Sequence, residues 1–183
     1  MSTAAGAVGS VVAQIAKIKG CYVVGSTGAA DKAAWLKNVV GLDAVINYKD
    51  QLIRTALEEA TPNGIDVYFD NVGGDHLEAA LRRMNSLGRI PVCGFISGYN
   101  SGQSSVSNLS NIIYARVTLR GFVGTDFMHL YGDFQRDMGQ WLKDGRVKYQ
   151  ETIMDGIADV PAAFIGLMEG RNSGKMMVRL TDE

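Results

Sequence analysis

The stretch Ala4-Ala5-Gly6-Ala7-Val8-Gly9 decides the fold prediction. It matches the dinucleotide-binding fingerprint, with alanine in place of the first glycine. In such a loop Gly6 lets the backbone approach a pyrophosphate, and Gly9 lets the following helix pack closely on the sheet. The backbone N–H groups of Ala7 to Ser10 then point at the anion. A bare match is a weak motif, because small residues also open ordinary packed helices.

The sequence on either side strengthens the motif and shows where it is incomplete. An amphipathic helix over Val8 to Ile18, then Gly20 and the apolar run Cys21 to Gly25, follow it as in a nucleotide-binding β-α-β unit. Only Met1 to Thr3 precede it, where a strand of about five or six residues is expected. We therefore expect a sheet that lacks its first strand, in a truncated gene product or a cloned fragment.

The rest of the chain alternates short apolar runs with helical stretches, which predicts an α/β fold. The expected strands are Cys21 to Gly25, Ala44 to Tyr48, Ile65 to Asn71, Arg89 to Phe95 and Thr118 to Val123. The expected helices are Val8 to Ile18, Ala30 to Val39, Asp50 to Glu59, Asp75 to Met84 and Phe127 to Lys143. Since the strand runs are nearly continuously apolar, both faces of the sheet are expected to be buried. The pattern is that of a Rossmann-type doubly wound parallel sheet.

The last part of the chain has a different order of elements. From Tyr149 onward we expect a strand over Gln150 to Met154, a helix from Val160 to about Met168 and a strand over Lys175 to Leu180. The prediction is a dinucleotide-binding domain over residues 1–148 and a strand-helix-strand tail over 149–183. Ser97 to Ser110, rich in Ser, Gly and Asn, is expected to be a mobile loop. Helices are expected to exit through left-handed glycines at Gly20, Gly41 and Gly145.

Composition narrows the class of protein. The 183 residues are 46% hydrophobic and 20% charged, with a formal net charge of −1. Without a basic run, no nucleic acid or anionic membrane is expected as a partner. Without a signal peptide or a bilayer-spanning apolar run, we expect a soluble cytoplasmic protein. The two cysteines and two histidines lie in unrelated contexts, so neither a disulfide framework nor a metal site is expected.

The exit of the second expected strand indicates which dinucleotide is bound. A site that prefers NAD carries an acid about 20 residues after the glycines, to hold the ribose hydroxyls. Here the loop reads Gly25-Ser26-Thr27-Gly28, with no acid. Lys32 on the next helix suits the 2′-phosphate of NADP, which favours NADPH as cofactor. The competing interpretation is an ordinary exposed helix lysine.

Other residues favour structural roles or exclude families. An acid at a strand end, such as Asp70, usually caps the backbone rather than acting as a base. For Cys93, a buried strand thiol that only packs is the favoured interpretation. The chain has no Tyr-x-x-x-Lys pair, which disfavours a short-chain dehydrogenase. The neutral loop at Gly25 to Gly28 also disfavours a methyltransferase, which typically places an acidic ribose ligand there.

Longer motifs carry a resemblance to a known family. They are Ala4 to Val12, Gln14 to Lys17, Gly20-Cys21, Asn47-Tyr48-Lys49, Tyr68 to Gly74, Gly88 to Gly94 and Asn172 to Lys175. With these motifs the chain resembles the zinc-independent medium-chain dehydrogenase/reductase family, in the branch of prostaglandin reductase and bacterial curcumin reductase. The resemblance runs over essentially the whole chain.

The resemblance implies an ene-reductase, in which NADPH delivers hydride to the β-carbon of an α,β-unsaturated ketone or aldehyde. Carried over by motif, the implied cofactor-binding residues are Gly6, Ala7, Val8, Gly9, Lys32, Tyr48, Asn71, Cys93, Gly94, Ser97, Tyr99, Phe122, Val123, Gly124 and Asn172. Tyr99 and Tyr114 are the candidate catalytic residues, because a phenol can hydrogen-bond a developing enolate. For Tyr114, ordinary half-buried packing is an equally good interpretation.

The resemblance also implies a missing partner domain. In the family, an N-terminal GroES-like domain forms the other wall of the substrate cleft, and the segment matching Val160 to Leu180 returns to it. We therefore expect a homo-oligomer, a dimer formed through the open sheet and tail, and no catalysis by this chain alone. Two alternatives stay open: an NADPH:quinone reductase of the same family, and a non-catalytic NADP(H)-binding module.

Overall fold

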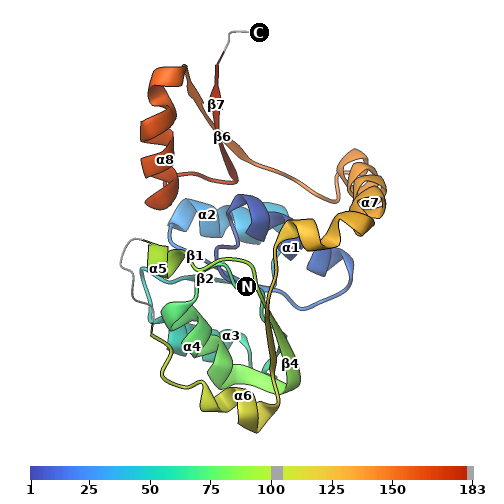
Figure 1. Cartoon of the computed structure of the whole chain (residues 1–183), viewed down its shortest axis with the longest axis vertical. Coiled ribbons are helices and arrows are strands. Elements are labelled where there is room, and N and C mark those ends of the chain that lie inside the picture. Colours follow the sequence, from blue (N-terminus) through green and yellow to red (C-terminus); the bar gives the residue numbers. More distant parts are fainter. Residues whose placement is uncertain (100–104, 181–183) are drawn as a thin grey trace.

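The fold is an α/β structure in which every strand ladder of the described residues is parallel. The computed structural model describes residues 1–99 and 105–180 (Figure 1). The strands are β1 (Val24–Thr27), β2 (Ala44–Asn47), β3 (Ile65–Val67), β4 (Met84–Val92), β5 (Thr118–Gly121), β6 (Glu151–Asp155) and β7 (Lys175–Arg179). The α-helices are α1 (Ala7–Ile18), α2 (Ala30–Trp35), α3 (Ile53–Ala60), α4 (Gly74–Arg83), α5 (Ile96–Tyr99), α6 (Ser110–Ala115), α7 (Tyr131–Lys143) and α8 (Val160–Met168). The remaining helical elements are the π-helix η1 (Leu36–Val40) and the 3₁₀-helices η2 (Gly124–Leu130) and η3 (Ile157–Asp159).

Two strand ladders make up the main part of the structure, and residues 1–4 connect them. One ladder pairs β1 with β2, and the other has the order β3-β4-β5. On one side, Ser26 N donates to Met1 O at 3.0 Å and Ala4 N donates to Ser26 O at 2.8 Å. On the other side, Ser2 N donates to Phe69 O at 3.2 Å. Residues 1–4 therefore supply hydrogen-bond partners at the position of the first strand that the sequence lacks.

Several element boundaries differ from the predictions for local reasons. β1 begins at Val24 rather than Cys21, because Cys21 N donates to Ala16 O and closes the end of α1. β4 begins at Met84, directly after α4, and ends at Val92 rather than Phe95. Cys93 thus lies beyond the strand and is exposed, so the prediction of a buried thiol is wrong. The long helix begins at Tyr131 instead of Phe127, whose φ of −114° is not helical.

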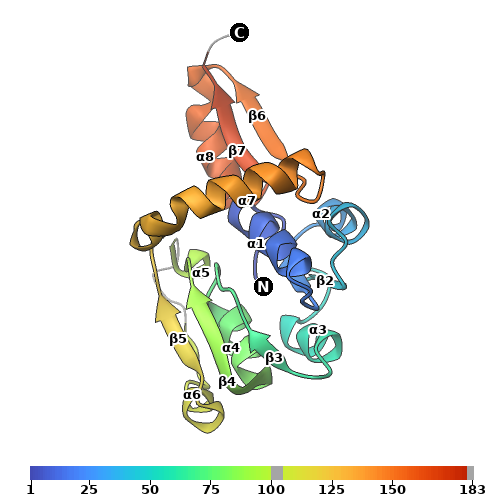
Figure 2. The same ribbon diagram turned by 90° about the vertical axis from the view of Figure 1, so that its right-hand side faces the viewer.

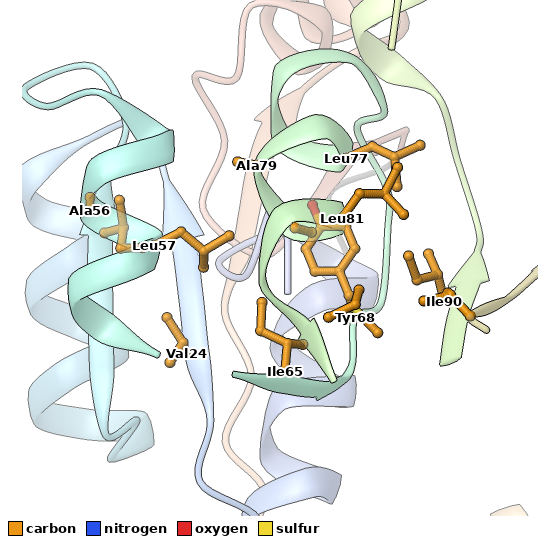
Figure 3. Packing of buried hydrophobic residues seen from close by; sticks show 13 residues of the cluster. Val24, Ala56, Leu57, Ile65, Tyr68, Leu77, Ala79, Leu81 and Ile90 are labelled. Atoms are coloured by element: carbon orange, nitrogen blue, oxygen red, sulfur yellow. The ribbon is translucent and has the colours of Figure 1, made fainter. Parts of the chain in front are cut away.

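The main hydrophobic core lies between the strands and the helices α3 and α4. Figure 3 shows Leu57 of α3 and Leu81 of α4 pointing into one cluster with Tyr68 and Ile90. Leu81 and Ile90 are 2% and 1% exposed, respectively. Burial of side chains of this size stabilises a fold by roughly 1.5–3 kcal/mol each. This core therefore fixes the positions of β3 and β4 relative to α3 and α4.

A second hydrophobic cluster lies next to the glycine loop and includes three alanines. Its buried members are Ala4, Ala5, Ala13, Val23, Leu36 and Leu42. The helices next to it end as predicted, since Gly20 and Gly41 have φ of +82° and +77°. Gly145, after α7, has φ of +65°, so all three predicted left-handed exits are confirmed.

The tail forms a two-stranded unit of its own. β6 pairs with β7 in parallel from Glu151 opposite Lys175 to Asp155 opposite Arg179, and α8 connects them. Figures 1 and 2 place this unit on the other side of α1 and α2 from α4 and α6. Of the predicted loop Ser97 to Ser110, residues 100–104 lie outside the described residues, whereas its two ends belong to α5 and α6.

Candidate functional site

Because the strands are parallel, their carboxyl ends meet at one edge of the sheet, here named the carboxyl edge. β1, β2, β4 and β5 end there at Thr27, Asn47, Val92 and Gly121. The glycine loop also opens at this edge, since it directly follows residues 1–4. In open parallel α/β sheets, ligands bind outside the carboxyl ends of the strands. The carboxyl edge is therefore the candidate site.

The glycine loop presents a helix N-terminus that is open to an anion. Gly6 is the N-cap of α1, has an extended backbone and gives no side-chain cap, and the first turn carries no acid. The first helical hydrogen bond runs from Ser10 N to Gly6 O at 2.9 Å. The N–H groups of Ala7, Val8 and Gly9 thus lack acceptors within the helix. Three such amides and the helix dipole suit a phosphate group.

Gly9 is the residue that brings α1 close to the sheet. A Cβ added to Gly9 would lie 2.1 Å from Thr3 O and 2.9 Å from Ala4 Cα. Both are backbone atoms that cannot move aside cheaply, so only glycine fits. Gly6 is less restricted, since an added Cβ would lie 3.2 Å from Thr3 Cγ2. The role predicted for Gly9 matches this packing.

Two lysines and a tyrosine gather where β1 and β2 end. An added Cβ on Gly28 would lie 2.7 Å from Tyr48 Oη and 3.3 Å from Lys49 Cε. Burial lowers the pKa of Lys32, the Asp31 carboxylate partly offsets this, and the nearby Lys49 ammonium lowers the pKa further. Lys32 Nζ donates to Gly170 O at 2.5 Å, which leaves further protons for another acceptor. Lys49 was missed from the sequence, although it directly follows Tyr48.

Asp70 and Asn71 organise the middle of the carboxyl edge. Asp70 is fully buried, and its carboxylate accepts from Ser2 Oγ at 3.0 Å, Tyr68 Oη at 3.2 Å and Gly73 N at 3.1 Å. The prediction that Asp70 caps backbone is confirmed. Burial, and next the Asp70 carboxylate, raise the pKa of Tyr68. Asn71 Nδ2 donates to Ser2 O at 3.0 Å, which fixes Asn71 against residues 1–4.

The residues after β4 form the next part of the carboxyl edge. Gly94 packs against Asn71, since an added Cβ would lie 3.2 Å from Asn71 O. Ser97 Oγ donates to Val72 O at 2.5 Å. Tyr99 is 62% exposed, and its hydroxyl accepts from Phe95 N at 3.5 Å. Partial burial raises the pKa of the Cys93 thiol, so Cys93 is not an activated thiolate.

Aromatic rings follow the end of β5. Phe122 packs edge-on against Phe69 and Phe127, with centroid distances of 5.9 and 5.7 Å. Val123 is 61% exposed, and an added Cβ on Gly124 would meet nothing within 4 Å. This end of the carboxyl edge is therefore apolar and open, in contrast to the basic end at Lys32.

The tail brings Asn172 to the glycine loop, 166 positions away from Gly6 in the chain. Gly174 N donates to Ala5 O at 2.9 Å, and Gly174 forms a parallel bridge with Gly6. Asn172 is buried, and its Nδ2 donates to Gly174 O at 2.7 Å. The predicted site residue Asn172 therefore stabilises the turn that contacts the loop.

Tyr114 is not brought to this site. It lies on α6, which directly precedes β5 and so stands at the amino end of the strands. Asn111 Nδ2 of α6 donates to Leu81 O near the end of α4, which confirms that placement. Tyr114 is 75% exposed there. The two candidate catalytic tyrosines therefore lie at opposite edges of the sheet.

A cleft of about 280 Å³ lies away from the carboxyl edge, between α3 and α4. Its lining includes Arg82 and Arg83. Arg82 pairs with Glu78 at 3.1 Å, and Arg83 Nη2 donates to Thr61 O at 2.5 Å. Arg83 therefore holds the end of α3 and Arg82 pairs within its own helix, so structural roles account for both arginines.

Comparison with known proteins agrees with this geometry. The sequence profile of the zinc-binding dehydrogenase family matches residues 7–144, which is most of the chain. The chain belongs to the zinc-binding dehydrogenase family. In this family member, no group of three or more His, Cys, Asp or Glu side chains that could hold a metal ion occurs in residues 1–99 and 105–180. None of the helices in those ranges is both long and apolar enough to cross a membrane.

Individual relatives place this chain in the branch of prostaglandin and curcumin reductases, as its motifs predicted. Prostaglandin reductase 1 of Bos taurus is 45% identical over 186 residues, covering 98% of this chain and 55% of that protein. (+)-Pulegone reductase of Mentha piperita is 44% identical over 185 residues, covering 100% of this chain and 54% of that protein. The chain thus spans about half the length of the curated relatives it matches.

Among solved structures, the crystal structure of CurA from Vibrio vulnificus in complex with NADPH is highly similar. It has a TM-score of 0.93 and 40% sequence identity, covering 100% of this chain and 56% of that one. The α/β fold with parallel strands is therefore that of the cofactor-binding part of this family.

Proposed function

We propose that this chain is the NADPH-binding part of an oxidoreductase that reduces the C=C bond of α,β-unsaturated ketones or aldehydes. In this proposal residues 1–148 are a Rossmann-type doubly wound domain, in which residues 1–4 take the place of the central strand, and 149–183 are the tail. The names of the related reductases and the NADPH bound to CurA support this assignment.

The observation that carries the proposal is the pairing of two anion sites at one edge of the sheet. The free amides of Ala7 to Gly9 suit a pyrophosphate, and the ammonium groups of Lys32 and Lys49 suit a 2′-phosphate. Between them the loop Gly25 to Gly28 carries no acid that would bind the ribose hydroxyls of NADH. NADPH carries both a pyrophosphate and a 2′-phosphate, whereas NADH lacks the 2′-phosphate.

The remaining contacts follow from position along the carboxyl edge. Tyr48 joins Lys32 at the 2′-phosphate end. The residues assigned to the nicotinamide side are Cys93, Gly94, Ser97 and Tyr99. Asn71, Phe122, Val123, Gly124 and Asn172 are assigned further cofactor contacts. Bound NADPH supplies the hydride for the β-carbon of the enone. Tyr99 Oη accepts a hydrogen bond in the structure, so its own proton is available to a carbonyl oxygen where enolate charge develops. Tyr114, at the other edge, has no role in this proposal.

Isothermal titration of the 183-residue chain with NADPH and with NADH tests the proposal. We expect binding that favours NADPH. Lys32→Ala should weaken NADPH binding about tenfold or more, the usual worth of a hydrogen bond to a charged group, and leave NADH binding unchanged. Lys143→Ala, an exposed lysine at the end of α7, is the matched control. Equal affinity for both dinucleotides, or no binding of either, would overturn the proposal.

A further inference from the structure

Tyr48 stands at the end of the carboxyl edge assigned to the 2′-phosphate. It follows β2 and is 41% exposed. Its hydroxyl lies beside Gly28 and close to the Lys49 side chain. A half-exposed tyrosine can adopt other rotamers, so its position depends on what its ring contacts.

The ring that contacts Tyr48 belongs to His76, in the first turn of α4. The two ring centroids are 4.9 Å apart and the rings stand at 83°, an edge-to-face arrangement. His76 is only 9% exposed, whereas Tyr48 reaches the surface. The buried ring therefore supports the exposed one from the side of the core.

His76 is not held there by its imidazole nitrogen Nε2. In the part of the chain that the structure describes, no hydrogen-bond partner reaches this buried atom. It lines a cavity of about 10 Å³ together with Ser26, whose buried Oγ also has no partner in the described residues. The other walls are mostly apolar and include Ile46 and Leu57. A buried polar atom without a partner destabilises a fold by about 1–3 kcal/mol, so stability does not account for a histidine here.

We propose that His76 is a positioning residue for cofactor preference: its ring orients Tyr48 toward the 2′-phosphate of NADPH. This inference rests on the proposed function, because it assumes that Lys32, Lys49 and Tyr48 form the 2′-phosphate site. It assigns to α4 a role in the 2′-phosphate site. His76 itself touches neither cofactor nor substrate in this account.

The test compares His76→Leu with His76→Phe in titrations with NADPH and NADH. Leucine removes the ring, so the Kd for NADPH should rise about two- to tenfold, the range expected for loss of one aromatic pair, while the Kd for NADH stays the same. Phenylalanine retains the ring without the nitrogen and should keep the wild-type preference. Ile53→Val, which changes another side chain of the same cavity and lies outside the assigned cofactor site, should also keep it.

A double-mutant cycle shows whether His76 acts through Tyr48. With Tyr48→Ala already in place, His76→Leu should cause no further change in NADPH affinity. Equal weakening of NADPH and NADH binding by His76→Leu would overturn the inference, because it would indicate general loosening of the fold. So would loss of preference in His76→Phe. A wild-type chain that prefers NADPH together with an unaffected His76→Leu variant refutes only this inference, whereas a wild-type chain without preference refutes the proposed function as well.

Discussion

Single residues were predictable where their sequence neighbours determine their chemistry. Asp70 lies at the end of an apolar run, and its carboxylate accepts hydrogen bonds from the N–H groups of Val72 and Gly73. Because these partners are close in sequence, the capping role could be inferred from the sequence. Cys93 was mispredicted because its exposure depends on where β4 ends. Ser2, which hydrogen-bonds Asp70 and Asn71, gave no signal, since its partners lie almost 70 positions away.

His76 should make the stability of the chain depend on pH. Burial lowers the pKa of His76 from its ordinary value of 6.5, Asp70 and Asp75 raise it in part, and the N-terminal ammonium lowers it. The folded state thus binds this proton less tightly than the unfolded state. The stability that neutral His76 contributes to the folded state is fully present above pH 6.5. It is lost as the pH falls below 6.5 through the pKa of His76 in the folded state. Chemical denaturation across this window should show stability falling by up to about 1.4 kcal/mol per pH unit.

The control for this effect is His76→Phe, which has no group to titrate. The N-terminal ammonium, whose pKa burial lowers to about 5, titrates in both proteins. The difference between their curves therefore reports His76 together with its interaction with that ammonium. Parallel curves for the two proteins below pH 6.5 would contradict the assignment.

At the scale of elements, the order and type of the longer helices and of the strands followed from periodicity, whereas the short helices α5 and α6 were not predicted. The boundaries were less predictable, because backbone hydrogen bonds at the junctions set them. The turn that ends α1 includes Cys21, so β1 starts three residues later than the apolar run. α4 passes into β4 at Met84 without a loop, although the turn-type residues Asn85, Ser86 and Gly88 follow in the sequence.

The packing of α1 on residues 3 and 4 gives a prediction at this scale. Gly9→Ala should lower the free energy of unfolding by about 1–3 kcal/mol, because its Cβ meets backbone atoms that cannot yield. It should also weaken NADPH binding by shifting the amides of α1. Thermal or chemical denaturation measures the first effect and titration the second.

Gly139→Ala is the matched control for Gly9→Ala. Gly139 lies inside α7, and an added Cβ there meets nothing within 4 Å. This change should be neutral or should stabilise the chain by about 0.5–1 kcal/mol. If Gly9→Ala were as well tolerated as Gly139→Ala, close approach of α1 to the sheet would not be needed.

At the scale of the whole molecule, the sequence indicated candidate site residues but not which of them lie in contact in the fold. The contact of Gly174 with Ala5 and Gly6 joins the two ends of the chain and has no local signature. Tyr114 illustrates the reverse case, because its phenol made it a catalytic candidate whereas the topology places it at the opposite edge. Periodicity carries no information on such long-range placement.

The exposed apolar surface of the tail predicts self-association. On α8, Phe164 and Ile165 are 63% and 53% exposed. The outer strands β2 and β5 also leave sheet edges that could pair with a second copy. Analytical ultracentrifugation should show a dimer that forms with rising concentration. Phe164→Asp should shift the chain toward monomer, and Lys143→Ala should not. A wild-type monomer at high concentration would refute the expected dimer.

The central claim is that the N-terminus of α1 and the exits of β1 and β2 form one NADPH site. Amide NMR spectra of the 183-residue chain during NADPH titration test it most directly. The account predicts that the signals of Ala7, Val8, Gly9 and Gly28 move together and saturate at one concentration, while those of α6 stay in place. Unchanged signals from Ala7 to Gly9, at NADPH concentrations that shift other amides, would contradict the account.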